Sequence, residues 1–159
     1  MDALYRFQAI SEDDLPLLAQ IYASSRHDQL VLASWPAEQR AQFLQQQFEY
    51  QHKHYLQAYP EANYDLIYVG EQVIGRLYVN RGTESVHIID ITLLPEFRNQ
   101  GLGTEIITQL FTEVRNRASG RVLSLSVEKT NNVMSLYHRL GFKIIYDDIT
   151  YVSMQWQAD

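Results

Sequence analysis

The 159-residue sequence contains no cysteine and no long apolar run, and each absence excludes a class of protein. Without cysteine there is no disulfide framework, no thiolate metal site and no cysteine nucleophile. No apolar stretch approaches the roughly 20 residues that a membrane-spanning helix needs. The first residues mix charged and apolar side chains, which is not the pattern of a secretory signal peptide. We therefore expect a cytoplasmic protein with no part in the membrane.

The sequence has few basic residues: it contains 13 lysines and arginines and 19 acidic residues, so the net charge is -6. Nucleic-acid-binding domains usually carry a basic surface, so nucleic acid is not expected as the main partner. The negative charge instead favours a cationic substrate such as an amine. Only His52 and His54 are spaced like metal ligands, and a solvated helix surface explains that pair, so we expect no metal.

The length suits a single domain over residues 1–159, and the apolar pattern predicts an α/β chain with one mixed sheet. Apolar alternation and continuous apolar runs predict strands at residues 4–10, 64–69, 73–80, 86–94, 122–127, 143–146 and 150–156. Helical spacing predicts helices at about residues 11–22, 34–59, 102–118 and 133–140. The order is β-α-α-β-β-β-α-β-α-β-β, with helices on both faces of the sheet.

The stretch from Leu93 to Thr104 joins a predicted strand to a predicted helix and carries glycines at positions 101 and 103. The missing side chains leave N–H groups, roughly from Gln100 to Thr104, free to point the same way. With the positive end of the helix they form a site suited to phosphate oxygens, and Arg98 could add a cation. Alternatively, both glycines only shape a tight turn. The Rossmann and P-loop fingerprints are absent, which argues against a protein that binds NAD or ATP.

Two motifs resemble the GNAT superfamily of N-acetyltransferases. Residues 98–103 read R-x-x-G-x-G, which is similar to the family's acetyl-CoA pyrophosphate motif, [Q/R]-x-x-G-x-[G/A]. Residues 136–142 read L-Y-H-R-L-G-F, which resembles the family's L-Y-x-x-L-G-F at the expected distance downstream. The resemblance covers residues 64–156 and implies a GNAT-like fold, with acetyl-CoA as the acetyl donor and a primary amine as the acceptor.

The resemblance also implies where acetyl-CoA binds. In the family it lies between two strands that splay apart, here those ending at Leu94 and Val127, and the pantetheine arm pairs with free backbone groups as an added strand would. The family's asparagine about seven residues before the tyrosine is replaced here by Thr130, with Asn131 and Asn132 following. The expected cofactor-binding residues are Ile91, Thr92, Leu93, Arg98, Asn99, Gln100, Gly101, Leu102, Gly103, Thr104, Thr130 and Asn132.

Three residues are candidates for the chemistry. Tyr137 fills the family's general-acid position, and a phenol with a pKa near 10 can donate to a thiolate whose pKa is near 8.5. It could also be an ordinary core tyrosine. His87 and Asp90 interrupt an apolar strand, and either could remove the proton of the amine or be a satisfied buried polar residue. Alternation places these two on opposite faces, and a water chain could replace both as the base.

The leading hypothesis is therefore an acetyl-CoA-dependent N-acetyltransferase that transfers the acetyl group directly to a primary amine. The acceptor is a small molecule or a protein amine, selected by the first two helices and the 55–64 segment. The alternative is a non-catalytic module that binds or senses acyl-CoA on the same fold. An exposed last strand could pair with a second copy to form a homodimer.

Overall fold

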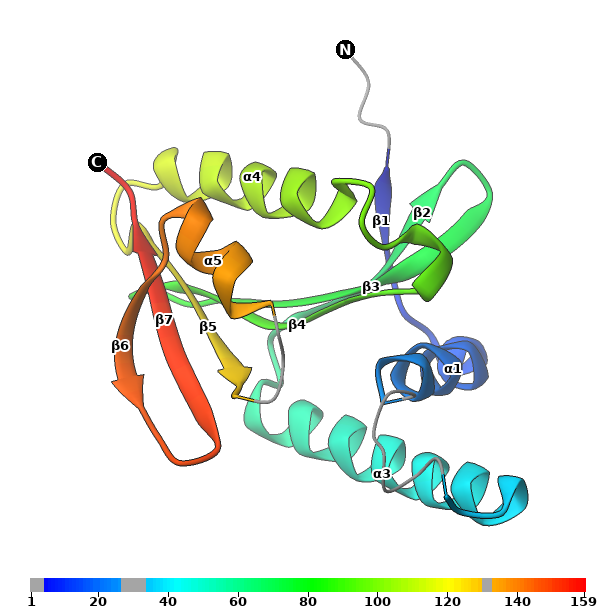
Figure 1. The fold of residues 1–159 in the computed structure, drawn as a ribbon. Helices are drawn as coiled ribbons and strands as arrows, with labels where there is room; N and C mark the ends of the chain where they lie inside the picture. The colour runs from blue at the N-terminus through cyan, green and yellow to red at the C-terminus, as the bar shows by residue number, and fades with distance from the viewer. Residues whose placement is uncertain (1–4, 27–33, 130–132) are drawn as a thin grey trace. The chain divides into compact units, whose positions relative to one another are not determined.

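The computed structural model describes residues 5–26, 34–129 and 133–159, and these form the predicted series of strands and helices (Figure 1). Two short 3-10 helices, Glu12–Asp14 and Pro95–Phe97, accompany them. The elements in chain order are β1 (Arg6–Ala9), α1 (Leu15–Ser25), α3 (Ala37–Ala58), β2 (Asn63–Val69), β3 (Gln72–Arg81), β4 (Val86–Leu93), α4 (Leu102–Arg115), β5 (Val122–Glu128), α5 (Met134–Leu140), β6 (Lys143–Asp147) and β7 (Tyr151–Gln157).

The strands are hydrogen-bonded in the order β1-β2-β3-β4-β5-β7-β6. β4 and β5 run parallel, whereas the β1–β2, β5–β7 and β6–β7 pairs are antiparallel. The sheet is therefore mixed, as the sequence predicted. The chain also divides into two compact units, and β3 and β4 each contribute residues to both.

The first unit contains the chain up to Leu77 together with Ile91–Gln100. Its helices α1 and α3 pack together through apolar residues, and the rings of Tyr22 and Phe48 lie 6.2 Å apart. Gly75 on β3 is packed so tightly against β4 that a Cβ atom there would lie 2.2 Å from the carbonyl oxygen of Thr92. The first unit therefore holds the end of β4 close to β3.

The second unit contains Tyr78–Asp90 and Gly101–Asp159. Its helix α4 lies where helical spacing predicted one, and it buries one apolar face, because residues three and four apart share one face of a helix. The ring of Phe111 on this face stacks 4.0 Å from that of Trp156 on β7. The buried residues of α4 are Leu102, Ile106, Ile107, Leu110, Phe111 and Val114.

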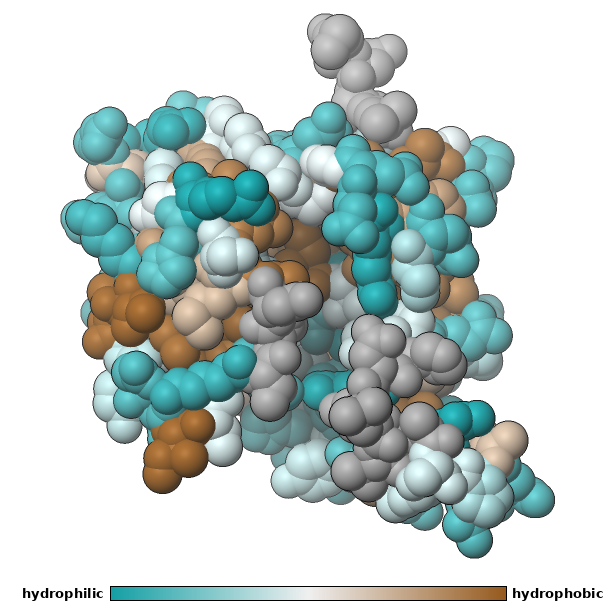
Figure 2. Space-filling model, viewed as in Figure 1, coloured by the Kyte–Doolittle hydropathy of each residue, from teal (hydrophilic) through white to brown (hydrophobic). Residues whose placement is uncertain are grey.

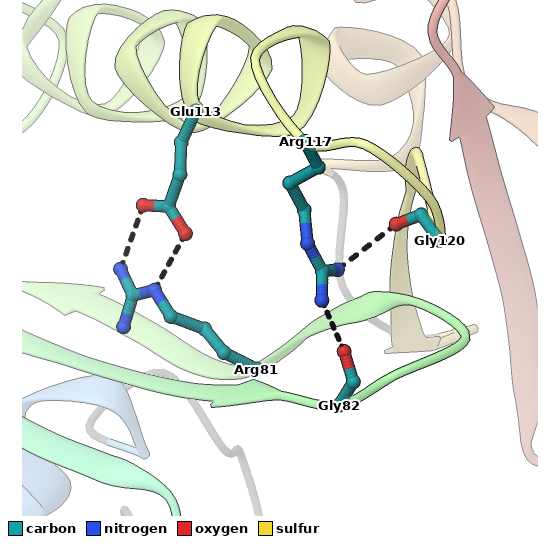
Figure 3. Close-up of polar contacts among 5 residues, drawn as sticks. All are labelled: Arg81, Gly82, Glu113, Arg117 and Gly120. Carbon is teal, nitrogen blue, oxygen red and sulfur yellow. Dashed lines mark hydrogen bonds and ion pairs between the residues drawn. The ribbon is translucent and has the colours of Figure 1, made fainter.

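Two arginines join the C-terminal end of α4 to the end of β3 and to neighbouring turns of the second unit (Figure 3). Arg81 at the end of β3 donates from Nε and Nη2 to the carboxylate of Glu113, at 2.6 and 2.9 Å. Arg117 donates to the carbonyl oxygen of Gly120 at 2.9 Å and to that of Gly82. These contacts fix α4 at the end opposite its glycine-bearing start.

Among the described residues, no helix has both the length and the apolar character to cross a membrane. The same part of the chain contains no group of three or more His, Cys, Asp or Glu side chains that could hold a metal ion.

We predict that Arg117→Ala lowers the free energy of unfolding by about 1–3 kcal/mol, because two carbonyl oxygens lose their donor. Glu113→Ala, which breaks a partly exposed ion pair, should cost no more than about 1 kcal/mol. Denaturant unfolding measured on both variants checks the ranking. Equal losses, or a larger loss in Glu113→Ala, would contradict it.

Candidate active site

The first turn of α4 starts at a glycine in a left-handed conformation. Gly101 is the N-cap residue, with φ 81° and ψ 0°, and no side chain of the described residues caps the helix end. The amide of Glu105 donates to the carbonyl oxygen of Gly101 at 3.0 Å, so it makes the first intrahelical bond. The N–H groups of Leu102, Gly103 and Thr104 precede that bond and have no acceptor within the helix.

The residues just before the helix set the direction of the turn. Asn99 also has a positive φ, 61°, which asparagine tolerates better than most residues. Gln100 donates from its side-chain Nε2 to the carbonyl oxygen of Glu96 at 2.8 Å, so it ties the turn to the preceding 3-10 helix. The sequence predicted that glycine allows the backbone to bend before this helix, and Gly101 adopts the left-handed conformation that such a bend needs.

Arg98 lies in the first unit and is hydrogen-bonded to the backbone. Its Nε donates to the carbonyl oxygen of Leu93 at 2.9 Å, and its Nη2 lies 3.4 Å from the carbonyl oxygen of Ser24 on α1. Arg98 therefore ties the end of β4 to α1. The guanidinium thus has a structural role, and its role as a cation for phosphate stays a prediction.

The last residues of β4, from Ile91 to Leu93, are half-buried. The amide of Leu94 donates to the carbonyl oxygen of Ile74 on β3 at 2.8 Å. Because successive backbone groups of a strand point to opposite edges, the N–H and C=O of Leu93 point away from β3. The carbonyl accepts from Arg98, which leaves the Leu93 N–H as the group best oriented for an incoming chain.

Within the second unit, the ladder between β4 and β5 joins Val86–Ile88 to Leu123–Leu125. β5 continues past this ladder and stays paired with β7 through Glu128. The pairing of β5 with β4 therefore ends before β5 does, which agrees with the expected separation of these two strands.

Tyr137 is almost fully buried on α5, with 8% of its surface exposed. Burial raises the pKa of its phenol to about 12, and the nearby carboxylate of Asp90 adds to the rise. Its ring meets that of Phe142 edge-on at 5.6 Å. The structure thus brings two of the three predicted catalytic residues together, and it keeps the phenol protonated at neutral pH.

His87 has a different partner. Its Nδ1 lies 2.8 Å from the Oγ of Ser124, the residue directly opposite on β5. Burial lowers the pKa of the imidazole, so it is neutral at pH 7. Asp90, three residues further along β4, faces the other side by alternation. Ser124 was not among the predicted residues, because only the parallel β4–β5 register identifies it.

Two predicted cofactor contacts, Thr130 and Asn132, lie outside the described residues.

A model of the acetyltransferase (GNAT) family matches residues 18–142. The chain belongs to this family. The match covers most of the chain and both sequence motifs, so the predicted resemblance to this acetyltransferase family is confirmed. No curated protein sequence matches the chain.

Solved structures of several acetyltransferases share the fold. The PaiA N-acetyltransferase from Thermoplasma acidophilum, in complex with coenzyme A, has a TM-score of 0.70 and 16% identity over 96% of this chain and 98% of that one. The ribosomal-protein-S18-alanine N-acetyltransferase from Escherichia coli has a TM-score of 0.63 and 17% identity over 98% and 94%. A GNAT family acetyltransferase from Elizabethkingia anophelis with acetyl-CoA bound has a TM-score of 0.55 and 16% identity over 66% and 82%. At such identities the likeness shows the fold alone.

The lowered pKa of His87 predicts how stability depends on pH. An unfolded histidine titrates near 6.5, so below that pH the unfolded chain binds a proton here more readily than the folded protein. The contribution of neutral His87 is present above about pH 6.5 and is lost as pH falls through the folded pKa. The free energy of unfolding, measured with denaturant at about pH 7 and pH 5, should therefore fall less in His87→Gln than in the wild type.

His138→Gln, a substitution at an exposed histidine, is the matched control. An unchanged pH dependence in His87→Gln would show that this imidazole is not buried as described.

Proposed function

We propose that this acetyltransferase binds acetyl-CoA with the pyrophosphate at the N-terminus of α4 and transfers the acetyl group directly to a primary amine. One observation carries the proposal: the helix begins at a left-handed glycine that has no side chain to occupy its first N–H groups. Three amides and the positive helix end then suit phosphate oxygens. Two neighbours of the same fold, solved with coenzyme A and acetyl-CoA, support the choice of ligand.

The amide-rich pantetheine arm would extend the end of β4. In this proposal the Leu93 N–H, which points away from β3, pairs with an arm carbonyl, and Ile91 and Thr92 line the same stretch. Arg98 donates to the Leu93 carbonyl at 2.9 Å, and we propose it as a further cation for the phosphates. The other proposed phosphate contacts are Asn99, Gln100, Gly101, Leu102, Gly103 and Thr104, with Thr130 or Asn132 as further cofactor contacts.

In the proposed reaction a neutral amine attacks the thioester carbonyl. A C–N bond forms, the C–S bond breaks, and coenzyme A leaves as a thiolate. The phenol of Tyr137 has a pKa of about 12, and a thiol has one near 8.5. Full proton transfer to the thiolate would thus be uphill by roughly 5 kcal/mol. We therefore assign Tyr137 a hydrogen bond to the developing thiolate, not the loss of its proton.

The proton of the amine needs another acceptor. Asp90 is the better-placed candidate, because its carboxylate is close enough to Tyr137 to raise the pKa of the phenol. His87 is neutral and could accept a proton, but it is hydrogen-bonded to Ser124 and lies on the other face of β4. Asp90 would take the proton directly or through a chain of waters.

The acceptor is a small amine or a protein amine. The net charge of -6 favours a cationic acceptor of either kind. The E. coli neighbour, by its name, acetylates an alanine of ribosomal protein S18, which supports including peptide N-termini in a screen. We further propose that residues 1–159 act as a single catalytic domain in the cytoplasm.

Tyr137→Phe tests the role of the phenol. We expect kcat to fall by roughly a hundredfold, because one donor to the developing charge is lost, while the Kd for acetyl-CoA changes little. Release of the coenzyme A thiol, measured with a panel of amines and peptides, gives the rate, and calorimetry gives the affinity.

Tyr146→Phe, an exposed tyrosine on β6, is the matched control and should keep wild-type turnover. Undiminished turnover in Tyr137→Phe would refute the donor role. A wild-type protein that binds acetyl-CoA but acetylates no amine would favour a non-catalytic acyl-CoA sensor.

Gly101→Asp tests the phosphate site. An aspartate at this position favours the helix electrostatically but repels phosphate, so the Kd for acetyl-CoA should rise by about tenfold or more. Gly101→Asn has the same shape without the charge and should have a clearly smaller effect. Calorimetric titration of both variants gives the comparison, and equal affinities in the two would mean that no anion binds at this helix end.

A further inference from the structure

Apolar side chains gather on the surface of the C-terminal hairpin. Six large apolar residues are exposed among the described parts of the chain, and four of them fall between positions 144 and 149. Figure 2 shows brown surface over the β6–β7 hairpin, including its tip. We call the four residues the β6 patch: Ile144, Ile145, Tyr146 and Ile149.

The patch lies on an edge strand. β6 is the last strand in the hydrogen-bonded order, so one of its edges pairs with β7, and no strand of the described residues lies beside the other edge. All five residues of β6 are exposed. Proteins usually protect such edges with charge or by keeping them short, as in β1, which is four residues long and reads R-F-Q-A. An exposed apolar edge of this kind indicates a partner.

The sequence of β6 is complementary to itself. It reads Lys-Ile-Ile-Tyr-Asp from Lys143 to Asp147. Aligned antiparallel with a second copy about Ile145, it matches each lysine with an aspartate and each Ile144 with a tyrosine. Lys143 forms no ion pair within the described chain. Asp147 forms one, with the exposed Lys129 at 2.5 Å, and it has a second carboxylate oxygen to offer.

A bulge lies at the centre of this alignment. Ile144 pairs with Met154 and Tyr146 pairs with Ser153, so Ile145 has no opposite residue on β7. A bulge interrupts the regular spacing of backbone groups along an edge. A contact here would therefore depend on the side chains of the β6 patch and on the flanking charges more than on a continuous ladder.

We propose that the β6 patch is a homodimer interface in which two copies of β6 lie antiparallel across a two-fold axis at Ile145. Lys143 of each copy meets the partner's Asp147, and Ile145 packs on the partner's Ile145. A two-fold axis makes each contact occur twice, so a single self-complementary strand suffices. This interface is independent of the acetyl-transfer chemistry.

Sedimentation velocity between about 1 and 100 μM tests the apolar contact. The wild type should dimerise. Ile145→Asp, which brings two carboxylates together at the axis, should raise the dimer Kd by at least about tenfold. Tyr50→Asp removes an even more exposed apolar side chain from α3 and should leave the Kd unchanged. Both variants should keep wild-type acetyl-CoA affinity, which shows that they are folded.

A charge exchange tests the alignment. Lys143→Asp and Asp147→Lys should each weaken the dimer, because each places like charges opposite one another. The double variant K143D/D147K should recover dimerisation, since the charges again match across the axis. Recovery supports the antiparallel alignment. A wild type that stays monomeric at about 100 μM overturns the proposal, and the β6 patch would then bind a different protein. A double variant that dimerises more weakly than both single variants also overturns it.

Discussion

The proposed cofactor site depends on a helix that starts without a capping side chain from the described residues. Most helix ends are satisfied by Ser, Thr, Asp or Asn, and α4 instead begins at Gly101 in a left-handed conformation. Its first amides are left for another acceptor, and the rest of the second unit holds the helix in place. The buried row from Leu102 to Val114 fixes one side, and Arg117 fixes the far end.

Much of the fold could be predicted from the sequence because its signals are local. Each signal lies within a short stretch of sequence: the apolar run of β4, the helical spacing of α4 and the glycine turn. The structure contains all three. The strand order could not be predicted, since nothing local indicates that β7 and not β6 pairs with β5. The bulge at Ile145 depends on the same pairing and was missed for the same reason.

The candidate site was predicted less completely than the fold. Tyr137 and Asp90 were chosen from a motif and from an interrupted apolar strand, and only the folded structure shows that the carboxylate lies close enough to raise the pKa of the phenol. The partners of His87 and Arg98 are Ser124 and the backbone of Ser24, which lie 37 and 74 positions away in sequence. Burial also moves the pKa of Tyr137 away from the value of a free phenol, which changes its proposed role from acid to hydrogen-bond donor.

The central claim is that the first amides of α4 hold the phosphates of acetyl-CoA. Backbone amide NMR of the wild-type protein, titrated with coenzyme A and separately with NAD, tests it most directly. We expect coenzyme A to shift the amide resonances of Gly103 and Thr104 strongly, because phosphate oxygens accept hydrogen bonds from them, and NAD to leave them in place. Saturable binding of coenzyme A that leaves both resonances unmoved would contradict the account.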